Sequence, residues 1–384
     1  KGKGIDRLLV AGCMVNRYGD ELAREIPEID GFIGLDEIRD ADRLVQLGGS
    51  APSAGPAHMV FDHSAPRLLT TRGYAFLKVA EGCNNPCTFC AIPSWRGRFR
   101  SRSIESLVLE AKNLEAAGCR ELCLIAQDTT RYGEDLDYGR HGLLRLVESL
   151  LKETTIPWIR FLYAYPTTLD PELLRLMGTE ERFVSYLDIP LQHSHPEILS
   201  AMRRGGSAQR YLSLLERARE NVPGIALRST FIVGFPGERE DHFRHLLDFV
   251  RQARFDHLGV FVYSPEEGTP GAGLPGRLPH AVSARRREQL LELQRPISLA
   301  SRERLVGRTV QVLVEGVCDE TEFLLVGRHE GMAPEIDGRL LINDGQATAG
   351  EFAQVEIHEA YADDLVGAVV EDRAAAYERT KLPR

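Results

Sequence analysis

The regular alternation of strand-like and helix-like segments between about residue 70 and residue 305 limits the fold of this chain more than any other feature. Six apolar, strand-like runs are each followed by a stretch with helical periodicity. Such repeats form parallel sheets with right-handed crossovers. They predict an α/β fold with a barrel-like, partly open sheet whose site lies at the carboxyl ends of the strands. The expected strands are 74–80, 121–126, 158–163, 186–189, 226–233 and 257–263, and the expected helices are 103–117, 141–153, 170–177, 196–202, 208–221, 238–253 and 283–305.

The segments on either side of this repeat follow other patterns. The start of the chain alternates between short strands and helices, at 5–11, 17–26, 31–34 and 36–47. A Gly-, Pro- and Ser-rich stretch then reads as a linker. After residue 305, five short strands separated by Gly, Asp and Asn predict a small antiparallel β-barrel of OB-like type, at 309–315, 322–327, 339–342, 354–360 and 365–370. The expected units are therefore 1–48, 49–68 (linker), 69–304 and 305–372.

Charge is distributed unevenly between these units. The chain carries a net charge of −9, but residues 305–372 hold 15 acidic residues, three arginines and no lysine, which leaves this segment at −12 and the remainder at +3. An acidic surface repels nucleic acid, so we expect no nucleic-acid binding through the C-terminal barrel. No apolar run approaches the ~18–20 residues that cross a bilayer, and no secretory signal opens the chain. A cytoplasmic protein without a membrane partner is the expectation.

Three of the seven cysteines, Cys83, Cys87 and Cys90, lie within eight residues directly after the first expected strand of the repeat. Clustered cysteines in such a chain indicate metal or redox chemistry rather than disulfides. Three thiolates can hold three corners of a 4Fe–4S cube, and no fourth ligand stands nearby, so one iron stays open. An open iron can chelate the amino and carboxylate groups of S-adenosylmethionine (SAM), and an electron then cleaves its carbon–sulfur bond. The alternatives are a zinc site, which normally has a fourth Cys or His, and buried structural cysteines.

Polar residues at other strand ends are further candidates for binding a cofactor. Gln127 and Asp128 follow strand 121–126, and Gln192 and His193 follow strand 186–189. A loop cap and a core histidine are the respective alternatives. Gly234 ends strand 226–233 where a backbone can approach a ligand closely, although a tight strand–helix turn explains it equally well.

Arginines form another group of candidates. Arg228 shares a strand face with Thr230 inside the expected barrel, and it requires an anionic partner such as the SAM carboxylate. Alternate arginines from Arg96 to Arg102 favour one basic face, for a substrate or for solvent. By contrast, we read Cys119, Cys123 and Cys318 as structural core residues.

Several blocks of sequence, taken together, resemble the methylthiotransferase branch of the radical SAM superfamily. The blocks are 81–93 with 96–97 and 101–102, Ile189-Pro-Leu-Gln-His193, Ala201-Met-Arg-Arg-Gly205, Ile232-Val-Gly-Phe-Pro-Gly-Glu238 and Tyr263-Ser-Pro-Glu-Glu-Gly-Thr-Pro270. The acidic barrel resembles that family's TRAM domain. The stretch Gln127-Asp-Thr-Thr-Arg-Tyr-Gly133 is similar to the RimO type, which modifies an aspartate of small-subunit ribosomal protein S12.

The resemblance implies a radical SAM partial (β/α) barrel, SAM as cofactor and two 4Fe–4S clusters. Cys83, Cys87 and Cys90 would hold the SAM-binding cluster. Cys13 matches the third ligand of the second cluster, whose other two ligands would lie before residue 1, so we expect the chain to begin inside its first domain; a buried structural cysteine is the alternative. The implied partners are the ribosomal protein, an external electron donor and a sulfur donor. The rival functions are a tRNA methylthiotransferase, which predicts salt-sensitive tRNA binding, and a non-catalytic iron–sulfur carrier or binding module.

Overall fold

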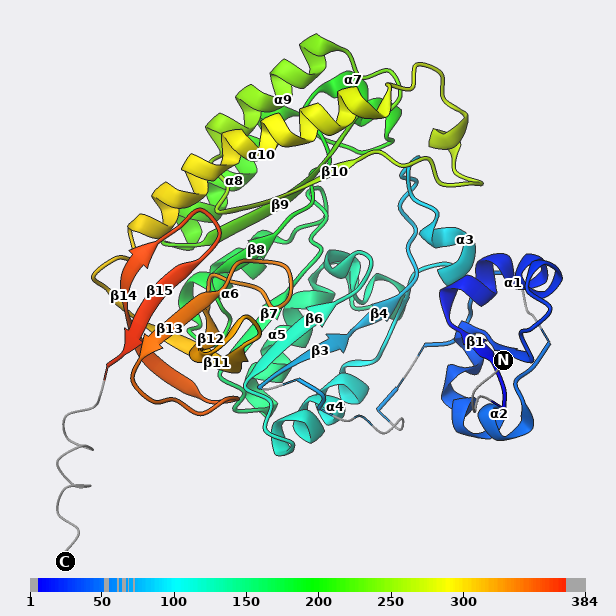
Figure 1. Cartoon of the computed structure of the whole chain (residues 1–384), viewed down its shortest axis with the longest axis horizontal. Helices are drawn as coiled ribbons and strands as arrows, with labels where there is room; N and C mark the ends of the chain where they lie inside the picture. Colours follow the sequence, from blue (N-terminus) through cyan, green and yellow to red (C-terminus); the bar gives the residue numbers. More distant parts are fainter. Residues whose placement is uncertain are drawn as a thin grey trace, which may run out of the picture.

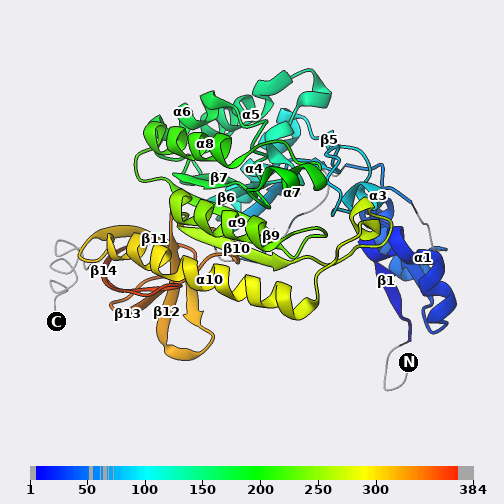
Figure 2. The ribbon, with the colours of Figure 1, turned by 90° about the horizontal axis from the view of Figure 1, so that it is seen from above.

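The structure, a computed structural model, describes residues 6–370 except 52–54, 61, 64–66, 68 and 72. The start of the first expected strand, parts of the linker and residues 371–372 therefore lie outside the described residues. A small N-terminal unit and a C-terminal barrel lie on opposite sides of a larger central unit (Figures 1 and 2). No helix in the described part of the chain combines the length and apolar character required to cross a membrane.

The N-terminal unit is a short α/β arrangement built on two parallel strands. Strands β1 and β2 pair side by side, and η1 is a 3₁₀ helix that runs into α2. Cys13 is the first residue of α1 and is separated from β1 by Gly12, so its thiol is held at a strand–helix junction. The elements are β1 (Leu9–Ala11), α1 (Cys13–Glu25), β2 (Gly31–Ile33), η1 (Leu35–Asp40) and α2 (Ala41–Leu47).

The central unit contains six parallel strands in sequence order, as the strand–helix repeat predicts. Strands β3 (Tyr74–Lys78), β6 (Glu121–Ile125) and β7 (Trp158–Phe161) form one ladder, and β8 (Tyr186–Asp188), β9 (Ala226–Val233) and β10 (His257–Val262) form another. The amide of Val184 donates to the carbonyl of Ile159 (3.0 Å) and joins the two ladders. No described strand bridges β10 and β3, so the arc stays open and the expected partial barrel is confirmed.

Helices that connect the strands cover the outer face of this arc (Figure 1). Their apolar faces meet the sheet in one large buried core, and Ser103, Asp170 and Ser207 cap three of them by accepting a backbone N–H two or three residues on. The helices are α3 (Ile92–Arg96), α4 (Ile104–Ala116), α5 (Gly142–Glu153), α6 (Pro171–Thr179), α7 (Pro196–Ala201), α8 (Ala208–Asn221), α9 (Glu240–Ala253) and α10 (His280–Glu303). Short elements complete the unit: β4 (Ala80–Glu81), β5 (Arg100–Ser101), η2 (Thr129–Arg131), η3 (Glu134–Leu136), η4 (Gly139–His141) and η5 (Pro270–Gly273).

The C-terminal strands close into a five-stranded barrel in the order β11-β12-β13-β15-β14. Apolar side chains from all five strands fill its interior. The sequence predicted an antiparallel barrel, and this is correct for four of the five pairs; β13 and β15 are parallel, because β15 returns to close the barrel against β13. The strands are β11 (Thr309–Cys318), β12 (Thr321–His329), β13 (Leu340–Asp344), β14 (Phe352–Ala360) and β15 (Leu365–Val369).

A buried ionic network joins this barrel to the central strands. The carboxylate of Glu121, at the start of β6, lies between Arg160 of β7 and Arg328 of β12, whose Nη2 donates to it at 2.6 Å. All three side chains are almost completely buried. Because a buried charge is tolerated only when it is paired, the two units are held in one arrangement.

Candidate functional site

The three clustered cysteines lie on a loop that folds back on itself directly after β4. Gly82 has a φ of +79°, and a Cβ at this position would lie 2.2 Å from the carbonyl oxygen of Arg98, so only glycine allows the loop to pass. The amide of Cys83 donates to the carbonyl of Gly97 (3.2 Å). Thr88 anchors the far side of the loop through its amide and hydroxyl, which donate to the carbonyls that end α7. Local turns therefore hold the three thiols at the carboxyl end of the strands.

Cys83, Cys87 and Cys90 all line one cavity of about 460 Å³. Gln127 and Gln192, which were expected to bind a cofactor, line the same cavity from the ends of neighbouring strands. The remaining lining residues come from the cysteine loop and the strand ends: Lys78, Asn85, Phe89, Ile92, Arg96, Ile125, Ala126, Tyr163, Ala164, Tyr165, Pro190 and Arg204. The cysteine spacing and the rule that sites lie at the carboxyl ends of parallel strands therefore predict the same cavity.

The charge of this cavity favours an anionic occupant. Among the described residues that line it, Lys78, Arg96 and Arg204 are cationic, and none is a carboxylate or an imidazole. Burial raises the pKa of the Cys83 thiol to about 11 and also raises the pKa of Cys90. Such thiols become thiolates readily only when a metal binds them, since a bound cation inverts the local electrostatics. Three thiols without a fourth Cys or His ligand, beside cationic side chains, fit a 4Fe–4S cluster with one open iron and the carboxylate of SAM.

Two strained backbone positions and one unpaired amide mark the strand-end wall of the cavity. Tyr163 and Gln192 have positive φ values of +64° and +71°. Non-glycine residues in this region cost free energy, and such strain gathers where side chains must be aimed. The Oε1 atom of Gln127 is buried and accepts no hydrogen bond within the described chain. A ligand donor in the cavity would satisfy it.

The structure does not bring Asp128 or Gly234 into this cavity. The buried carboxylate of Asp128 accepts hydrogen bonds from Asn85 Nδ2 and Thr130 Oγ1, both at 2.7 Å. Asp128 therefore orients the cysteine loop through Asn85. A Cβ on Gly234 would lie 2.1 Å from Ser283 Oγ of α10, so this glycine serves helix packing.

Arg228 also lies outside the cavity. The alternation of β9 was predicted correctly, since Arg228 Nη1 contacts Thr230 Oγ1 at 3.2 Å on the inner face. Its anionic partners, however, are the protein carboxylates Asp188 (3.0 Å) and Asp337 (3.3 Å). Arg228 lines a separate cavity beside α10 and the C-terminal barrel. Sequence alternation identifies the face of a strand but not which carboxylate reaches it.

The sequence singled out Arg204 only as part of a family-like block and did not predict that Arg204 lines the cysteine cavity. Its guanidinium lies over the ring of Tyr165 (4.4 Å), donates to Cys87 Sγ (3.6 Å) and donates to the carbonyl of Pro190 (2.6 Å). Tyr165 and Lys78 were not singled out either. The only signal for Arg204 was the Met-Arg-Arg-Gly block, because its approach to Cys87 depends on the path of the chain after α7.

Cys13 lies next to Arg96, whereas the arginines from Arg96 to Arg102 do not share one face. Cys13 is half-buried, and Arg96 Nη2 donates to its sulfur at 3.2 Å. The expected common face for Arg96 to Arg102 is wrong: Arg96 ends α3, Arg98 is exposed, and Arg102 is buried against Glu110 (2.6 Å). A helix followed by Gly97 with positive φ breaks the alternation. Cys119, Cys123 and Cys318 are buried, as expected.

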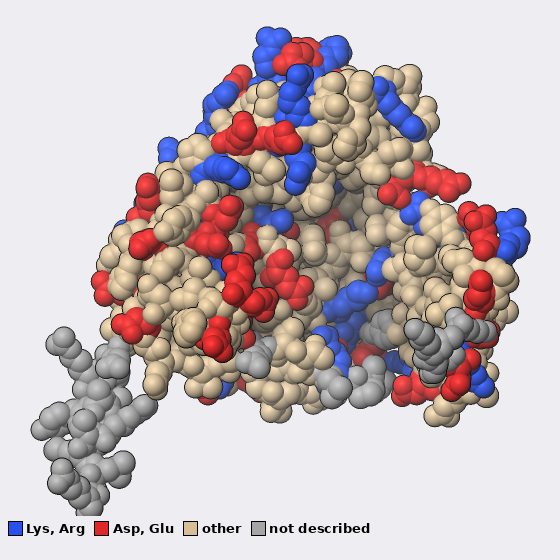
Figure 3. Space-filling model, viewed as in Figure 1, with Lys and Arg blue, Asp and Glu red and all other residues tan. Residues whose placement is uncertain are grey.

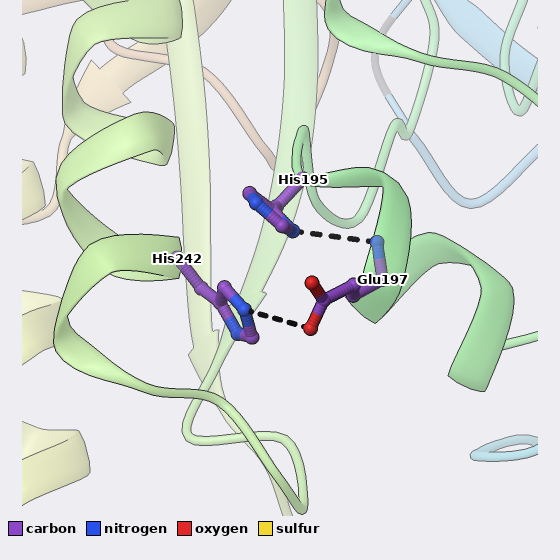
Figure 4. Close-up of side chains that lie close together, drawn as sticks. All are labelled: His195, Glu197 and His242. Atoms are coloured by element: carbon purple, nitrogen blue, oxygen red, sulfur yellow. Dashed lines mark hydrogen bonds and ion pairs between the residues drawn. The ribbon is translucent and has the colours of Figure 1, made fainter.

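A group of imidazoles at the start of α7 and α9 has a capping role (Figure 4). His195 Nδ1 accepts the amide of Glu197 (3.3 Å), and His242 Nδ1 accepts the amide of Arg239 (3.2 Å). The Nε2 of His242 lies 3.2 Å from the Glu197 carboxylate. Glu197 also pairs with Arg239 (3.0 Å), so these contacts complete two helix N-termini. His193 is fully buried behind them and does not line the cysteine cavity.

Comparison with known proteins agrees with this arrangement. Residues 77–250 match the radical SAM superfamily, and residues 306–370 match the TRAM domain. The chain is 47% identical over 366 residues to the ribosomal protein uS12 methylthiotransferase RimO of Anaeromyxobacter sp. (strain K), covering 95% of this chain and 78% of that protein. It is 44% identical over 373 residues to the RimO of Myxococcus xanthus (strain DK1622), with 97% and 78% covered. A solved structure, the cobalamin-dependent SAM radical enzyme OxsB with aqua-cobalamin, shares 17% identity at a TM-score of 0.48 over 69% of this chain and 41% of that one. By its relatives and its matched domains, this chain belongs to the family of ribosomal protein uS12 methylthiotransferases.

Proposed function

We propose that this chain is a SAM-dependent radical methylthiotransferase that adds a methylthio group to the β-carbon of an aspartate in small-subunit ribosomal protein uS12. Relatives that are 44–47% identical over nearly the whole chain carry that name. The observation that carries the proposal is the single cavity lined by Cys83, Cys87 and Cys90 with no fourth ligand among its described lining residues. Membership of the radical SAM superfamily implies a 4Fe–4S cluster and SAM.

The three cysteines are the residues that would hold the cluster. When bound, a 4Fe–4S cluster with SAM on its open iron supplies a primary carbon radical, which can abstract hydrogen from an unactivated carbon. An aspartate β-carbon is such a centre, because its C–H bond is too weakly acidic for a side-chain base to remove the proton. The need for a carbon radical separates the proposed reaction from group transfers that acid–base catalysis alone can drive.

Other side chains of the cavity bind, orient and exclude water. The guanidinium of Arg204 suits the carboxylate of SAM, whereas Lys78 already pairs with Glu81, and the unpaired Oε1 of Gln127 suits an amino or hydroxyl donor. Apolar side chains that line the same cavity, Phe89, Ile92 and Ile125, keep water from a reactive centre. Asp128 keeps the cysteine loop in place through Asn85.

A second cluster, to which Cys13 would contribute one ligand, remains part of the proposal, as do an external electron donor and a sulfur donor. The choice of a protein substrate over tRNA is supported by charge. Acidic side chains gather over the C-terminal barrel on the face shown in Figure 3, and residues 305–372 carry −12. Such a surface attracts a basic ribosomal protein and repels a phosphate backbone.

The test is anaerobic reconstitution of the full-length protein, with the two further cysteine ligands expected before residue 1, followed by reaction with SAM and reductant while uS12 and tRNA are offered separately. We expect 5′-deoxyadenosine, and a uS12 peptide heavier by a methylthio group less one hydrogen. Cys87→Ala abolishes both products, whereas the matched control Cys318→Ala, in the C-terminal barrel, retains them. A methylthio group found on tRNA alone would overturn the substrate, and SAM cleavage by Cys87→Ala would overturn the site.

A further inference from the structure

We propose that a second cavity of the chain, which lies between β10, α10 and the C-terminal barrel, is a binding site for a small dicarboxylate that carries a hydroxyl group. The cavity has a volume of about 250 Å³, and among the described residues it has no lining residue in common with the cysteine cavity. An interior cavity of about 150 Å³ accommodates benzene, so this one has room for an organic anion of about ten non-hydrogen atoms. The site stands independently of methylthio transfer.

A buried guanidinium in the wall of this second cavity lacks a carboxylate partner. Arg302, in the last turn of α10, is 7% exposed and forms no ion pair within the described part of the chain. Its Nη1 donates to the carbonyl of Ala362, whereas no described residue accepts a hydrogen bond from its Nε or Nη2. A buried charge without a counter-ion is costly, and two parallel N–H groups on one edge of a guanidinium match the two oxygens of a carboxylate. Arg302 therefore offers an unused carboxylate site to the cavity.

A second buried polar atom on the same helix also lacks a partner. Gln294 is 4% exposed, and its Nε2 donates to the carbonyl of Phe255 (2.7 Å) and to Ser298 Oγ (2.9 Å). These two contacts fix the orientation of the amide group, and they leave its Oε1 buried without a donor from the described residues. An unsatisfied buried acceptor in the wall of a cavity favours a ligand with a hydroxyl group.

The spacing of these groups along α10 determines the length of the ligand. Gln294 and Arg302 are eight residues apart, which corresponds to ~12 Å along the helix axis. A ligand that contacts both side chains must therefore be several atoms long, which excludes a single phosphate. Arg295 also lines the cavity, is exposed and has no ion-pair partner in the described chain, so it can receive a second carboxylate at the rim.

The carboxylates of the wall do not neutralise Arg302. Asp337 lies 3.3 Å from Nε of Arg228 and accepts the hydroxyl of Tyr186 (2.7 Å), so it is already engaged. Asp363 is exposed and lies beyond ion-pair distance of Arg302. Burial lowers the pKa of the Arg302 guanidinium, and nearby carboxylates, Asp363 foremost, only oppose this shift. The described lining residues include three arginines and two carboxylates, so the cavity keeps an excess positive charge.

Isothermal titration calorimetry with L-malate, succinate and inorganic phosphate tests this proposal on the full-length, anaerobically reconstituted protein at constant ionic strength. SAM is present and reductant is absent, because an organic acid would otherwise chelate the open iron of the cluster. We expect one molecule of L-malate to bind, and succinate, which lacks the hydroxyl group for Gln294, to bind about fivefold more weakly.

Two substitutions in α10 locate the bound anion. Arg302→Lys keeps the positive charge but not the edge with two N–H groups, so it should weaken L-malate binding about tenfold. The matched control is Arg285→Lys, because Arg285 is exposed on the same helix and does not line the cavity. We expect this control to bind L-malate as the wild type does.

The other possible results each overturn part of the proposal. A wild type that shows no saturable binding of L-malate refutes the site. Equal affinity for L-malate and succinate, or tighter binding of phosphate, refutes the class of ligand. Equal affinities of the two variants for L-malate place the anion elsewhere. If Arg302→Lys does not fold, hydrogen exchange of the wild type replaces it: L-malate should slow exchange in residues 336–338 and 362–363, and unchanged exchange there refutes the site.

Discussion

Replacing Gly234 with alanine should destabilise the protein through contact with one residue of α10. Gly234 ends the β9 segment with a φ of +78°, and an added Cβ would lie 2.1 Å from Ser283 Oγ and 2.6 Å from Ser283 Cβ. Both residues are buried, and Ser283 is only 3% exposed. The substitution therefore combines backbone strain with overpacking.

The two contributions can be separated in magnitude. A non-glycine residue in the left-handed region costs about 1–2 kcal/mol, and overpacking of a well-filled interior costs about 1–3 kcal/mol. The smaller entropy of the unfolded chain returns about 0.4–1 kcal/mol. We expect Gly234→Ala to lower the free energy of unfolding by about 1–4.6 kcal/mol. Adding Ser283→Gly should recover the overpacking part, less about 0.5 kcal/mol for glycine in a helix.

Urea denaturation of the wild type, both single variants and the double variant gives the coupling free energy between the two positions. We expect a favourable coupling of about 1–3 kcal/mol. A coupling below about 0.5 kcal/mol would refute the packing explanation. If the double variant regains stability yet fails to bind SAM, Gly234 contacts the cofactor, as the sequence had suggested, and its packing role is secondary.

Three further outcomes follow from buried groups. Glu121→Gln leaves two buried arginines without their carboxylate and should lower the free energy of unfolding, measured by urea denaturation, by about 3–5 kcal/mol. The control Lys112→Gln removes an exposed pair with Glu153 and should change this free energy by less than about 0.5 kcal/mol. Equal effects of the two substitutions would contradict a stabilising role for the buried network. In the metal-free protein, burial raises the pKa of Cys83 to about 11. Carboxymethylation of Cys83, followed by mass spectrometry, should therefore reach half its maximal rate near pH 11 in the folded protein, against about pH 8.5 in urea. A midpoint near pH 8.5 in the folded protein would show that burial does not control the pKa of this thiol. Burial, assisted by neighbouring histidines, lowers the pKa of His193 to about 3, so between about pH 6.5 and pH 3 this histidine is protonated in the unfolded state but neutral in the folded state. The free energy of unfolding of the wild type therefore falls as the pH drops below about 6.5. The difference in this free energy between the wild type and His193→Asn should narrow from pH 7 to pH 4.5, and a constant difference would contradict the prediction.

The longer elements could be predicted from sequence because periodicity reports burial directly. Strand β9 occupies the expected residues 226–233, and α8 the expected residues 208–221. Short elements escaped prediction: β4 has two residues and α3 has five, and neither is long enough for a period to show. The parallel pairing of β13 and β15 depends on barrel closure, which no local pattern encodes.

In the candidate site, too, some residues could be predicted from the sequence and others could not. Gln127 and Gln192 were found because polar residues at the ends of parallel strands converge on one edge of the sheet. Arg204 was missed as a wall residue, since its contact with Cys87 spans 117 positions. Arg228 was placed on the correct face, but only the fold reveals that two protein carboxylates already neutralise it.

The pairing of Glu121 with Arg328 has a practical consequence for chimaeras. Strand β6 begins at Glu121 and leads into Gln127, so the acceptor for an arginine of the C-terminal barrel stands on the strand that also supplies the wall of the cysteine cavity. A barrel grafted from a relative without a matching basic residue would leave the Oε2 atom of buried Glu121 without its partner, with Arg160 as the one remaining arginine of the network. Exchange of this barrel to alter substrate choice should therefore keep an arginine at the position of Arg328, because replacing Glu121 and Arg328 by apolar side chains would leave Arg160 buried without a carboxylate.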